Sequence, residues 1–310
     1  MGVPAQHQPV LYNEIIHFLN PRDAGRYVDG TLGGGGHARG ILEASAPEGR
    51  LLGLDLDPDA LEIASDRLVK FGSRTALIRA SYTTLRAQLD HLGWDKVDGI
   101  LLDLGLSSMQ LDSTRRGFSF QVDAPLDMRF DPNNSISAAD LVNNLSVEEL
   151  ANLLYRFGEE RHSYRVAKAI VAARPIASTR QLAQVVADST HGGRPGHHPA
   201  TRTFQALRIA VNQELDCLSE VLPQSIFSLN EGGRLAVISY HSLEDRIVKQ
   251  YYRQESTDCL CPPGQPVCTC GHRASILVLT RHPIRPGDDE VRMNPRSRSA
   301  RLRVAEKLPS

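Results

Sequence analysis

The chain has 310 residues, of which 41% are hydrophobic and 23% are charged, and its formal net charge is −1. This length suits one large domain or two smaller ones, and the hydrophobic content is enough for a buried core. The balanced charge excludes nucleic-acid binding through bulk basicity, so any such surface must be a local basic patch.

The start of the chain and its cysteines predict a cytoplasmic protein. Residues 1–21 are mixed in character and carry no signal peptide, and no apolar run is long enough to span a bilayer. The five cysteines do not form the framework of a secreted disulfide protein. We therefore expect no membrane contact.

Residues 1–112 alternate short apolar runs with helical patterns, which is typical of a parallel sheet wound with helices. The expected strands in this part are 27–28, 51–55, 76–79 and 99–104. The expected helices are 10–19, 38–44, 59–71 and 84–92. The pattern predicts an α/β fold with a mostly parallel sheet.

The stretch from Tyr27 to His37 predicts a strand, a tight turn and a helix. Its glycines allow the backbone to turn sharply and to lie against a ligand, and the first amides of the helix face that ligand. Asp55 ends the next strand about 20 residues later, where a ribose-binding acid belongs. A glycine-rich loop without a ligand is the alternative.

The glycine motif alone leaves two cofactors open. Gly33-x-Gly35-x-x-Ala38 satisfies the loose dinucleotide fingerprint, so an NAD-dependent oxidoreductase is one interpretation. Asp29, just before the glycines, is badly placed for a pyrophosphate and suits a ligand that carries an ammonium and a ribose, such as S-adenosylmethionine. Asp103 ends the fourth strand, so three acids should meet in one crevice at the carboxyl edge of the sheet.

Residues 111–134 form a long polar segment without a clear period, and a segment of this length in a compact domain is usually functional or disordered. Four helical patterns follow at 137–143, 146–157, 161–174 and 179–189, and Ser146-x-x-Glu149 is a capping box. We therefore expect a helical domain at 113–197, inserted into a domain formed by 1–112 and 198–310.

The last part of the chain returns to the α/β rhythm. Residues 201–221 predict one long amphipathic helix, 232–239 a strand, and Ser242 the cap of a helix at 243–252. Residues 276–279 and 302–304 are the last two strand candidates, and we expect them to pair antiparallel.

Six motifs in order along nearly the whole chain resemble one family. They are Asp29-Gly-Thr-Leu-Gly-x-Gly-Gly-His37, Asp103-Leu-Gly-x-Ser-Ser-x-Gln110, Arg116-Gly-Phe-Ser-Phe120, Pro125-Leu-Asp-Met-Arg129, His198-Pro-Ala-Thr-Arg-Thr-Phe-Gln-Ala-Leu-Arg208 and Ser242-Leu-Glu-Asp-Arg246. The chain thus resembles the bacterial 16S ribosomal RNA cytosine-N4 methyltransferases, the RsmH or MraW family. The resemblance implies a seven-stranded Rossmann-like class I methyltransferase sheet, S-adenosyl-L-methionine as cofactor, and a cytosine near the ribosomal decoding centre as substrate.

The resemblance also implies which residues bind the cofactor. By position they are Gly35, Gly36, His37, Asp55, Tyr82, Asp103 and Gln110. Asp55 would accept both ribose hydroxyls, Tyr82 would lie flat on the adenine, and Asp103 would pair with the ammonium. Simple core packing is the alternative for Tyr82, and a helix cap is the alternative for Asp103.

Methylation of an exocyclic amine needs orientation more than a strong base, because the proton can leave after the amine has become cationic. Many amino-methyltransferases carry Asn/Asp-Pro-Pro-Tyr/Phe after the fourth strand, but this chain has Asp103-Leu-Gly-Leu106. The acceptor for N4 is therefore left open among Asp103, Ser107 and Ser108. Asp127 and His241 stand behind them, and His241 is equally suited to capping or packing.

The expected partner is 16S rRNA in the small ribosomal subunit, with the oligomeric state left open between monomer and homodimer. Phe118 and Phe120 can stack on an extruded base, although a hydrophobic plug explains them equally well. Phosphate contacts could come from basic residues in three groups, Arg115, Arg116 and Arg129; Arg161, Arg165, Lys168 and Arg174; and Arg292, Arg296, Arg298, Arg301 and Arg303. For the last two groups, a solvated face is the alternative and the more usual explanation of such charge runs. A non-catalytic RNA-binding protein is the second rival function.

A cysteine-rich stretch follows the last predicted helix. It reads Cys259-x-Cys261-Pro-Pro-Gly-x-Pro-Val-Cys268-x-Cys270-Gly-His272, and its Cys-x-Cys spacing is tighter than the usual Cys-x-x-Cys of zinc sites. We expect no metal in the catalytic machinery and favour a reduced, metal-free loop. A structural zinc at Cys259, Cys261, Cys268 and Cys270 is the alternative.

Overall fold

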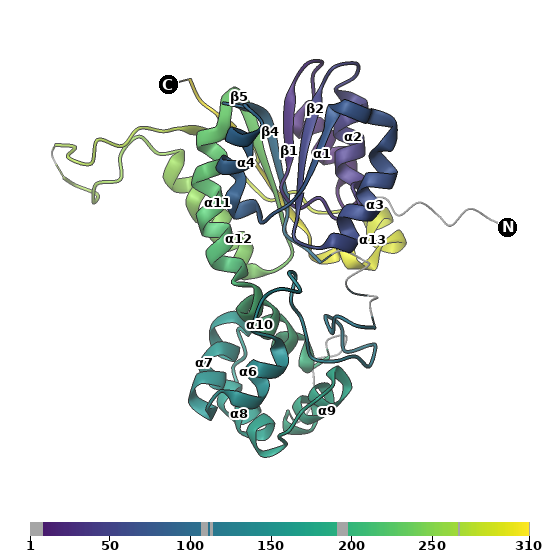
Figure 1. Ribbon diagram of the computed structural model, residues 1–310. Helices are drawn as coiled ribbons and strands as arrows, with labels where there is room; N and C mark the ends of the chain where they lie inside the picture. The colour runs from purple at the N-terminus through teal and green to yellow at the C-terminus, as the bar shows by residue number, and fades with distance from the viewer. Residues whose placement is uncertain (1–8, 107–110, 112–113, 191–197, 266, 310) are drawn as a thin grey trace. The chain divides into compact units, whose positions relative to one another are not determined.

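The computed structural model describes residues 9–106, 111, 114–190, 198–265 and 267–309 (Figure 1). The chain forms two compact units. Unit 1 comprises Met1–Gly105 and Cys217–Ser310, and unit 2 comprises Leu106–Asp216. Among the described residues, no helix combines the length and the apolar character needed to cross a bilayer.

Unit 1 is built on a seven-stranded sheet with the order β3-β2-β1-β4-β5-β7-β6. The pairs β1–β2, β1–β4, β2–β3 and β4–β5 are parallel, whereas β7 is antiparallel to both β5 and β6. This confirms the predicted Rossmann-like, mostly parallel sheet with an antiparallel pair at its end. The strands are β1 Arg26–Asp29, β2 Arg50–Asp55, β3 Thr75–Arg79, β4 Val97–Asp103, β5 Leu229–Ser239, β6 Ile276–Val278 and β7 Arg301–Lys307.

Helices cover both faces of this sheet (Figure 1). Successive strand residues point to opposite faces, so Val28 and Leu52 belong to one buried cluster and Tyr27 and Leu51 to another. The helices α1 Tyr12–Leu19, α2 Gly36–Ala44 and α3 Pro58–Leu68 pack on the second cluster, and α4 Leu85–His91, α11 Glu214–Ser228 and α12 Ser242–Glu255 pack on the first. The shorter helical pieces are η1 Val69–Arg74, η2 Tyr82–Thr84, α13 Asp288–Met293 and η3 Pro295–Ser299.

The strand order places a topological switch point beside β1. The chain proceeds from β1 through β2 to β3 on one side, and then returns to β4 on the other side of β1. In open α/β sheets, ligands bind outside the carboxyl ends of the strands at such a point. Asp29 and Asp103 end the two strands that flank it.

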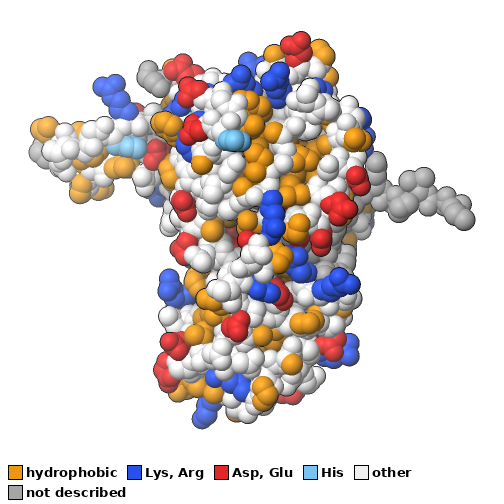
Figure 2. All heavy atoms as spheres, viewed as in Figure 1, with side chains coloured by type: hydrophobic (Ala, Val, Ile, Leu, Met, Phe, Trp, Pro, Cys, Tyr) orange, Lys and Arg blue, Asp and Glu red, His pale blue; other side chains and the backbone are white. Residues whose placement is uncertain are grey.

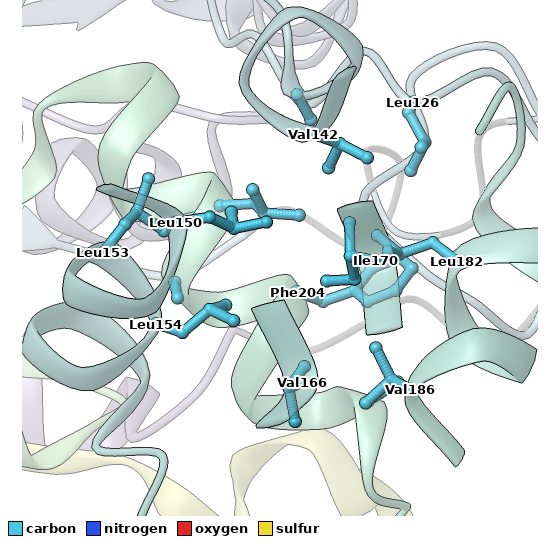
Figure 3. Packing of buried hydrophobic residues seen from close by; sticks show 14 of the residues in the cluster. Leu126, Val142, Leu150, Leu153, Leu154, Val166, Ile170, Leu182, Val186 and Phe204 are labelled. Carbon is cyan, nitrogen blue, oxygen red and sulfur yellow. The ribbon is translucent and has the colours of Figure 1, made fainter. Parts of the chain in front are cut away.

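Unit 2 is helical and has its own hydrophobic core. Figure 3 shows apolar side chains from several helices pointing toward one another, among them Leu150, Ile170 and Phe204. The helices are α6 Ala138–Asn144, α7 Val147–Gly158, α8 Ser163–Ala172, α9 Thr179–Ser189 and α10 Ala200–Asn212. The predicted boundary at 197/198 differs from the observed one because Phe204 and Leu207 of α10 belong to this core.

The single long helix predicted for 201–221 is wrong, because the chain turns between α10 and α11. Gln213 has a φ of 51°, in the left-handed region, where it caps α10. The side chain of Asn212 accepts from Phe130 N (2.7 Å) and donates to the carbonyl of Met128 (2.7 Å). These contacts are made to a part of the chain that lies far away in sequence, so helical periodicity does not reveal the turn.

The described part of the segment before α6 is ordered by packing and hydrogen bonds within unit 2. Phe118 is 6% exposed and stacks on Phe130, with 5.5 Å between ring centroids. Phe120 stacks on His198 at 4.5 Å and meets Phe204 edge-on at 5.2 Å. These contacts make the two phenylalanines part of the packing of unit 2, whereas the predicted alternative to base stacking was a hydrophobic plug that ties the insertion to the sheet.

Arg116 and Arg129 in this segment also have structural partners. Arg129 binds both carboxylate oxygens of Asp127 and donates to the carbonyl of Asn134. Arg116 donates to the carbonyls of Arg129 and Phe130 (3.0 and 2.9 Å). Their expected role as phosphate contacts therefore competes with contacts that hold the segment together.

One capping prediction is confirmed and one is wrong. Ser146 caps α7 and forms the predicted capping box with Glu149, and Ser178 caps α9. Ser242 is not the cap of α12, because His241 occupies that position and its side chain accepts from Glu244 N. His241 thus has the capping role that was left open for it.

Charges of both signs alternate on the face of the molecule shown in Figure 2, in keeping with the near-zero net charge. Near the C-terminus, Arg303 is 7% exposed and bonds to Asp245 at 2.7 Å, and Arg301 bonds to the same carboxylate at 3.1 Å. These two arginines hold β7 against α12, which makes them poor candidates for phosphate binding.

Candidate active site

The glycine stretch between β1 and α2 forms the floor of the site. Gly30 N donates to Leu101 O of β4 and Leu32 N donates to Leu54 O of β2, both at 2.9 Å, so the turn is tied to both neighbouring strands. Gly35 has a φ of +72° and is the cap residue of α2. A Cβ atom at Gly35 would lie 3.3 Å from Ala64 and Leu68 of α3. Glycine therefore meets both a backbone and a space requirement at this position.

Asp55 at the end of β2 holds this turn in place. Its Oδ2 accepts from Gly33 N at 2.8 Å, and its Oδ1 accepts from Asp57 N at 2.9 Å. Burial raises its pKa, and the two amide hydrogen bonds oppose that rise. Each carboxylate oxygen has a further lone pair, so Asp55 can still accept ligand hydroxyls.

Asp29 at the end of β1 is a buried carboxyl group, and one of its oxygens has no hydrogen-bond partner among the described residues. It is 1% exposed, and its Oδ1 accepts from Thr31 N at 3.2 Å. No described protein group hydrogen-bonds to its Oδ2. Burial raises its pKa to about 7, opposed by the Thr31 amide and reinforced by the charges of Asp103 and Asp55.

Asp103 at the end of β4 shares these properties. Its N–H donates to the hydroxyl of Thr31 at 2.6 Å, which couples the ends of β1 and β4 across the switch point. Burial raises its pKa to about 6, while a hydrogen bond from the Tyr240 hydroxyl opposes the rise. Its Oδ1 has no partner among the described protein groups. The helix-cap alternative for Asp103 falls on residues 107–113, of which only Leu111, a helical residue, is described, so it stays a prediction.

His37 lies beside Asp103 and stays neutral. Its Nε2 is 3.8 Å from Asp103 Oδ2, and it is 6% exposed. Burial lowers its pKa to about 4. Neither ring nitrogen has a hydrogen-bond partner within the described chain. A neutral imidazole at this position adds no positive charge to a site whose free groups are carboxylate oxygens.

Tyr240, which the sequence analysis missed, completes the site in unit 1. It follows β5, and its hydroxyl bonds to Asp103. Glu244 is 1% exposed and accepts from Tyr240 N at 2.8 Å, so it fixes the backbone of that tyrosine. Gly105 allows the close approach, because a Cβ there would lie 2.5 Å from the Tyr240 ring. The signal was available, since β5 neighbours β4 and its carboxyl end reaches the same edge.

Most of the predicted site residues come together at this edge. Gly35, Gly36 and His37 open α2, and Asp55 and Asp103 end β2 and β4. Ser107, Ser108 and Gln110 lie outside the described residues. Of the remaining residues, Tyr82, Asp127 and His241, the last one caps α12.

Tyr82 follows β3 in η2 and is partly buried against the core on the α4 side of the sheet. A Cβ at Gly30 would lie 3.3 Å from its Cβ, so Tyr82 stands next to the glycine turn. It therefore packs in the core and borders the site, and the two interpretations do not exclude each other. Asp127 belongs to unit 2 and is engaged by Arg129.

The raised pKa values of Asp29 and Asp103 predict how stability depends on pH. Their folded pKa values of about 7 and 6 lie above those in the unfolded chain, so the folded state binds more protons in between. Asp29 and Asp103 should therefore lower the free energy of unfolding as the pH rises from about 4 to about 7, and the lowered pKa of His37, about 4, opposes part of this fall up to a pH of about 6.5. Denaturant unfolding of the ligand-free protein across this range measures the effect.

A pair of variants isolates the contribution of Asp29. Asp29→Asn removes one titrating group from the site, so its stability should fall less steeply with pH than that of the wild type. Asp90→Asn is the control, because Asp90 is exposed on α4, where its side chain pairs with Arg86. Parallel curves for wild type and Asp29→Asn would contradict the assignment.

The chain is similar to several known proteins. Residues 4–308 match the MraW methylase family. The chain is 52% identical over 305 residues to the Ribosomal RNA small subunit methyltransferase H of Thermomicrobium roseum, covering 97% of this chain and 94% of the relative. It is also 52% identical over 308 residues to the protein of the same name from Syntrophotalea carbinolica, covering 98% of both chains. Among solved structures, an rRNA methylase from Streptococcus thermophilus matches 98% of this chain and 100% of its own at 13% identity, with a TM-score of 0.43.

Proposed function

The chain belongs to the MraW methylase family, and we propose that it transfers a methyl group from S-adenosyl-L-methionine to N4 of a cytosine in 16S rRNA near the ribosomal decoding centre. The observation that carries this proposal is the pair of carboxyl groups of Asp29, which is buried, and Asp103, whose side chain is 23% exposed; each keeps one buried oxygen without a hydrogen-bond partner among the described residues at the switch point. A cationic ligand is what such a pair can bind.

The residues fit S-adenosylmethionine better than a dinucleotide. Its ammonium and sulfonium groups are cations, which suit the carboxylates of Asp29 and Asp103, whereas a pyrophosphate would be repelled by them. Asp55 can accept the ribose hydroxyls through the lone pairs that the Gly33 and Asp57 amides leave. Tyr82 borders the turn and offers an aromatic face for an adenine.

When bound, S-adenosylmethionine supplies a methyl group on a positively charged sulfur. The carboxylates of Asp29 and Asp103 hold the cation, and the hydrogen bond from Tyr240 keeps Asp103 in one orientation. Because burial keeps His37 neutral, it does not repel a cation at this edge. Fixed orientation of this kind can lower a barrier by several kcal/mol, about 7 or more in favourable cases.

The group that accepts a hydrogen bond from N4 is proposed among Asp103, Ser107 and Ser108. The Oδ1 atom of Asp103 has no hydrogen-bond partner among the described residues. This one oxygen can contact either the cation or the base amine. If Asp103 is committed to the cation, the acceptor role falls to Ser107 or Ser108. His241 is a weaker candidate, because its side chain caps α12 and contacts Glu244 at 3.1 Å.

We assign RNA binding to unit 2 and its contact surface to α7, α8 and the turn between them. Tyr155 and Tyr164 are 64% and 58% exposed there, which is unusual for large aromatic side chains. Arg161, Arg165 and Lys168 are exposed on the same part of unit 2. Exposed aromatic rings among cations are typical of single-stranded RNA surfaces. Arg174, predicted with this group, instead donates to the carbonyls of Val142 and Leu145.

Charge reversal on α8 tests this surface. The double variant Arg165→Glu, Lys168→Glu should weaken binding to 16S rRNA about tenfold or more at low salt and reduce the salt dependence of binding. The matched control reverses Arg180, which is exposed on α9 of the same unit. Equal losses in both variants, or none in either, would contradict the assignment of the surface.

A thermal-shift panel separates the proposed function from its rivals. S-adenosylmethionine should raise the melting temperature, and NAD should not, because only the first offers cations to the paired carboxyl groups. A non-catalytic RNA-binding protein would bind RNA without stabilisation by S-adenosylmethionine. Stabilisation by NAD alone would favour the oxidoreductase.

The setting of the reaction is also proposed. We place the substrate in the small ribosomal subunit or its precursor, and the protein in the cytoplasm where that subunit assembles. A homodimer stays a proposal that sedimentation of the purified protein can test. Methylation assays on free 16S rRNA and on isolated small subunits separate the two forms of substrate.

A further inference from the structure

The segment between α12 and β6 brings four cysteines together. Their Sγ atoms all lie within 4.8 Å of one another, although the residues span the segment from Cys259 to Cys270. Within the described residues, the segment has neither helix nor strand between Glu255 and Ile276. Figure 1 shows it in yellow-green, extending away from α12 as a long loop.

Hydrogen bonds close the base of this loop, and near its tip Gln265 donates to Val267 O and Thr269 Oγ1. At the base, Ser275 N and Oγ both donate to Glu255, at 2.8 Å each. Toward the tip, Leu260 and Val267 are 43% and 69% exposed, so the loop buries little apolar surface. A loop of this length without a hydrophobic core usually needs a covalent or metal staple to hold one conformation.

The sulfur positions match those of a metal site better than those of disulfides. Zinc–sulfur bonds of about 2.3 Å in a tetrahedral site place the sulfurs about 3.8 Å apart. The observed separations are 3.5 Å for Cys259–Cys268, 3.5 Å for Cys268–Cys270 and 3.9 Å for Cys270–Cys259. A disulfide would need about 2.05 Å within one pair and would not gather all four sulfurs.

Backbone amides point at the sulfurs in the manner of a thiolate site. Cys270 Sγ accepts from Leu260 N at 3.3 Å and from His272 N at 3.5 Å, and Cys261 Sγ accepts from Thr269 N at 3.4 Å. Amide donors to metal-bound sulfur orient the ligand and offset its negative charge. A thiol sulfur is only a weak acceptor, so these donors are better used by thiolates.

We propose that Cys259, Cys261, Cys268 and Cys270 bind one structural zinc ion that fixes the conformation of this loop. The closed set of four thiolates leaves no coordination position for a substrate, which is typical of structural zinc sites. The site is separate from the carboxylates at the edge of the sheet, and the proposal does not depend on the proposed methyl transfer. It reverses the preference for a metal-free loop that the Cys-x-Cys spacing suggested.

Metal analysis of the full-length protein, purified without chelators, tests the proposal. The wild type should carry about one zinc per chain, and the double variant Cys259→Ser, Cys270→Ser should carry none. Cys217→Ser is the control, because Cys217 lies on α11 outside the loop, and it should keep the zinc. A wild type without bound zinc, or a double variant with as much zinc as the wild type, would overturn the proposal.

A second measurement follows the loop itself. Removal of zinc by a strong chelator should make proteolysis within residues 256–275 faster, and added zinc should restore resistance. S-adenosylmethionine binding should change less than about twofold, which separates this site from the cofactor site. Disulfides between these cysteines in protein purified under reducing conditions, or cleavage that the chelator leaves unchanged, would overturn the proposal.

Discussion

Asp103→Asn should weaken the binding of S-adenosylmethionine about 100-fold, which corresponds to about 2.7 kcal/mol. Asparagine keeps the size of the side chain but removes the negative charge that the cation meets. The pKa of Asp103 is raised to about 6 by burial, so its carboxylate is costly to keep charged in the ligand-free protein. The ligand-free variant should therefore be at least as stable as the wild type at a pH of about 8.

Isothermal titration calorimetry with S-adenosylmethionine and S-adenosylhomocysteine measures this effect and locates it. Equal losses for both ligands indicate that Asp103 pairs with the ammonium, which both carry, and a loss for S-adenosylmethionine alone indicates the sulfonium. Asp90→Asn, on the exposed surface of α4, should bind both ligands as the wild type does. An affinity of Asp103→Asn within about threefold of the wild type would contradict the assignment.

Gly117→Ala should destabilise unit 2 by about 2–5 kcal/mol. Gly117 has a φ of +67°, and a Cβ there would lie 2.1 Å from the carbonyl oxygen of Pro125. The left-handed conformation alone costs an alanine about 1–2 kcal/mol, and the clash with a backbone atom adds about 1–3 kcal/mol. The oxygen cannot move easily, because it already accepts from Asp127 N at 2.9 Å. Hydrogen exchange of the amides of unit 2 measures the loss.

Gly93→Ala is the matched control for the backbone term. Gly93 also has a φ of +67°, but a Cβ there would meet nothing within 4 Å, so this variant should show only the conformational cost of about 1–2 kcal/mol. Gly117→Ala should lose RNA binding while S-adenosylmethionine still binds, because the cofactor residues that the structure describes belong to unit 1. Equal destabilisation by the two substitutions would contradict the predicted clash.

Local signals in the sequence were sufficient for most of the fold. Each strand combines an apolar run with a turn or an acid at its end, and the capping box at Ser146 depends on residues three positions apart. The acids that end β1, β2 and β4 could be placed at one edge because parallel strands share their carboxyl ends. These features depend on neighbours in the sequence or on a rule of sheet topology.

The features that sequence analysis missed depend on distant contacts. The turn at Gln213 follows Asn212, whose side chain forms hydrogen bonds with the backbone of Phe130 and Met128. Arg303 is of the residue type that binds phosphate, but its side chain is buried against Asp245. Similarly, the gathering of the four cysteine sulfurs is a property of the folded loop, because Cys-x-Cys spacing alone is compatible with several outcomes.

Nucleoside mass spectrometry of 16S rRNA tests the central claim most directly. Ribosomal RNA from cells that lack this protein should lose N4-methylation of one cytosine, and the wild-type gene should restore it while the Asp103→Asn variant should not. An unchanged N4-methylcytidine content in the absence of the protein would contradict the account.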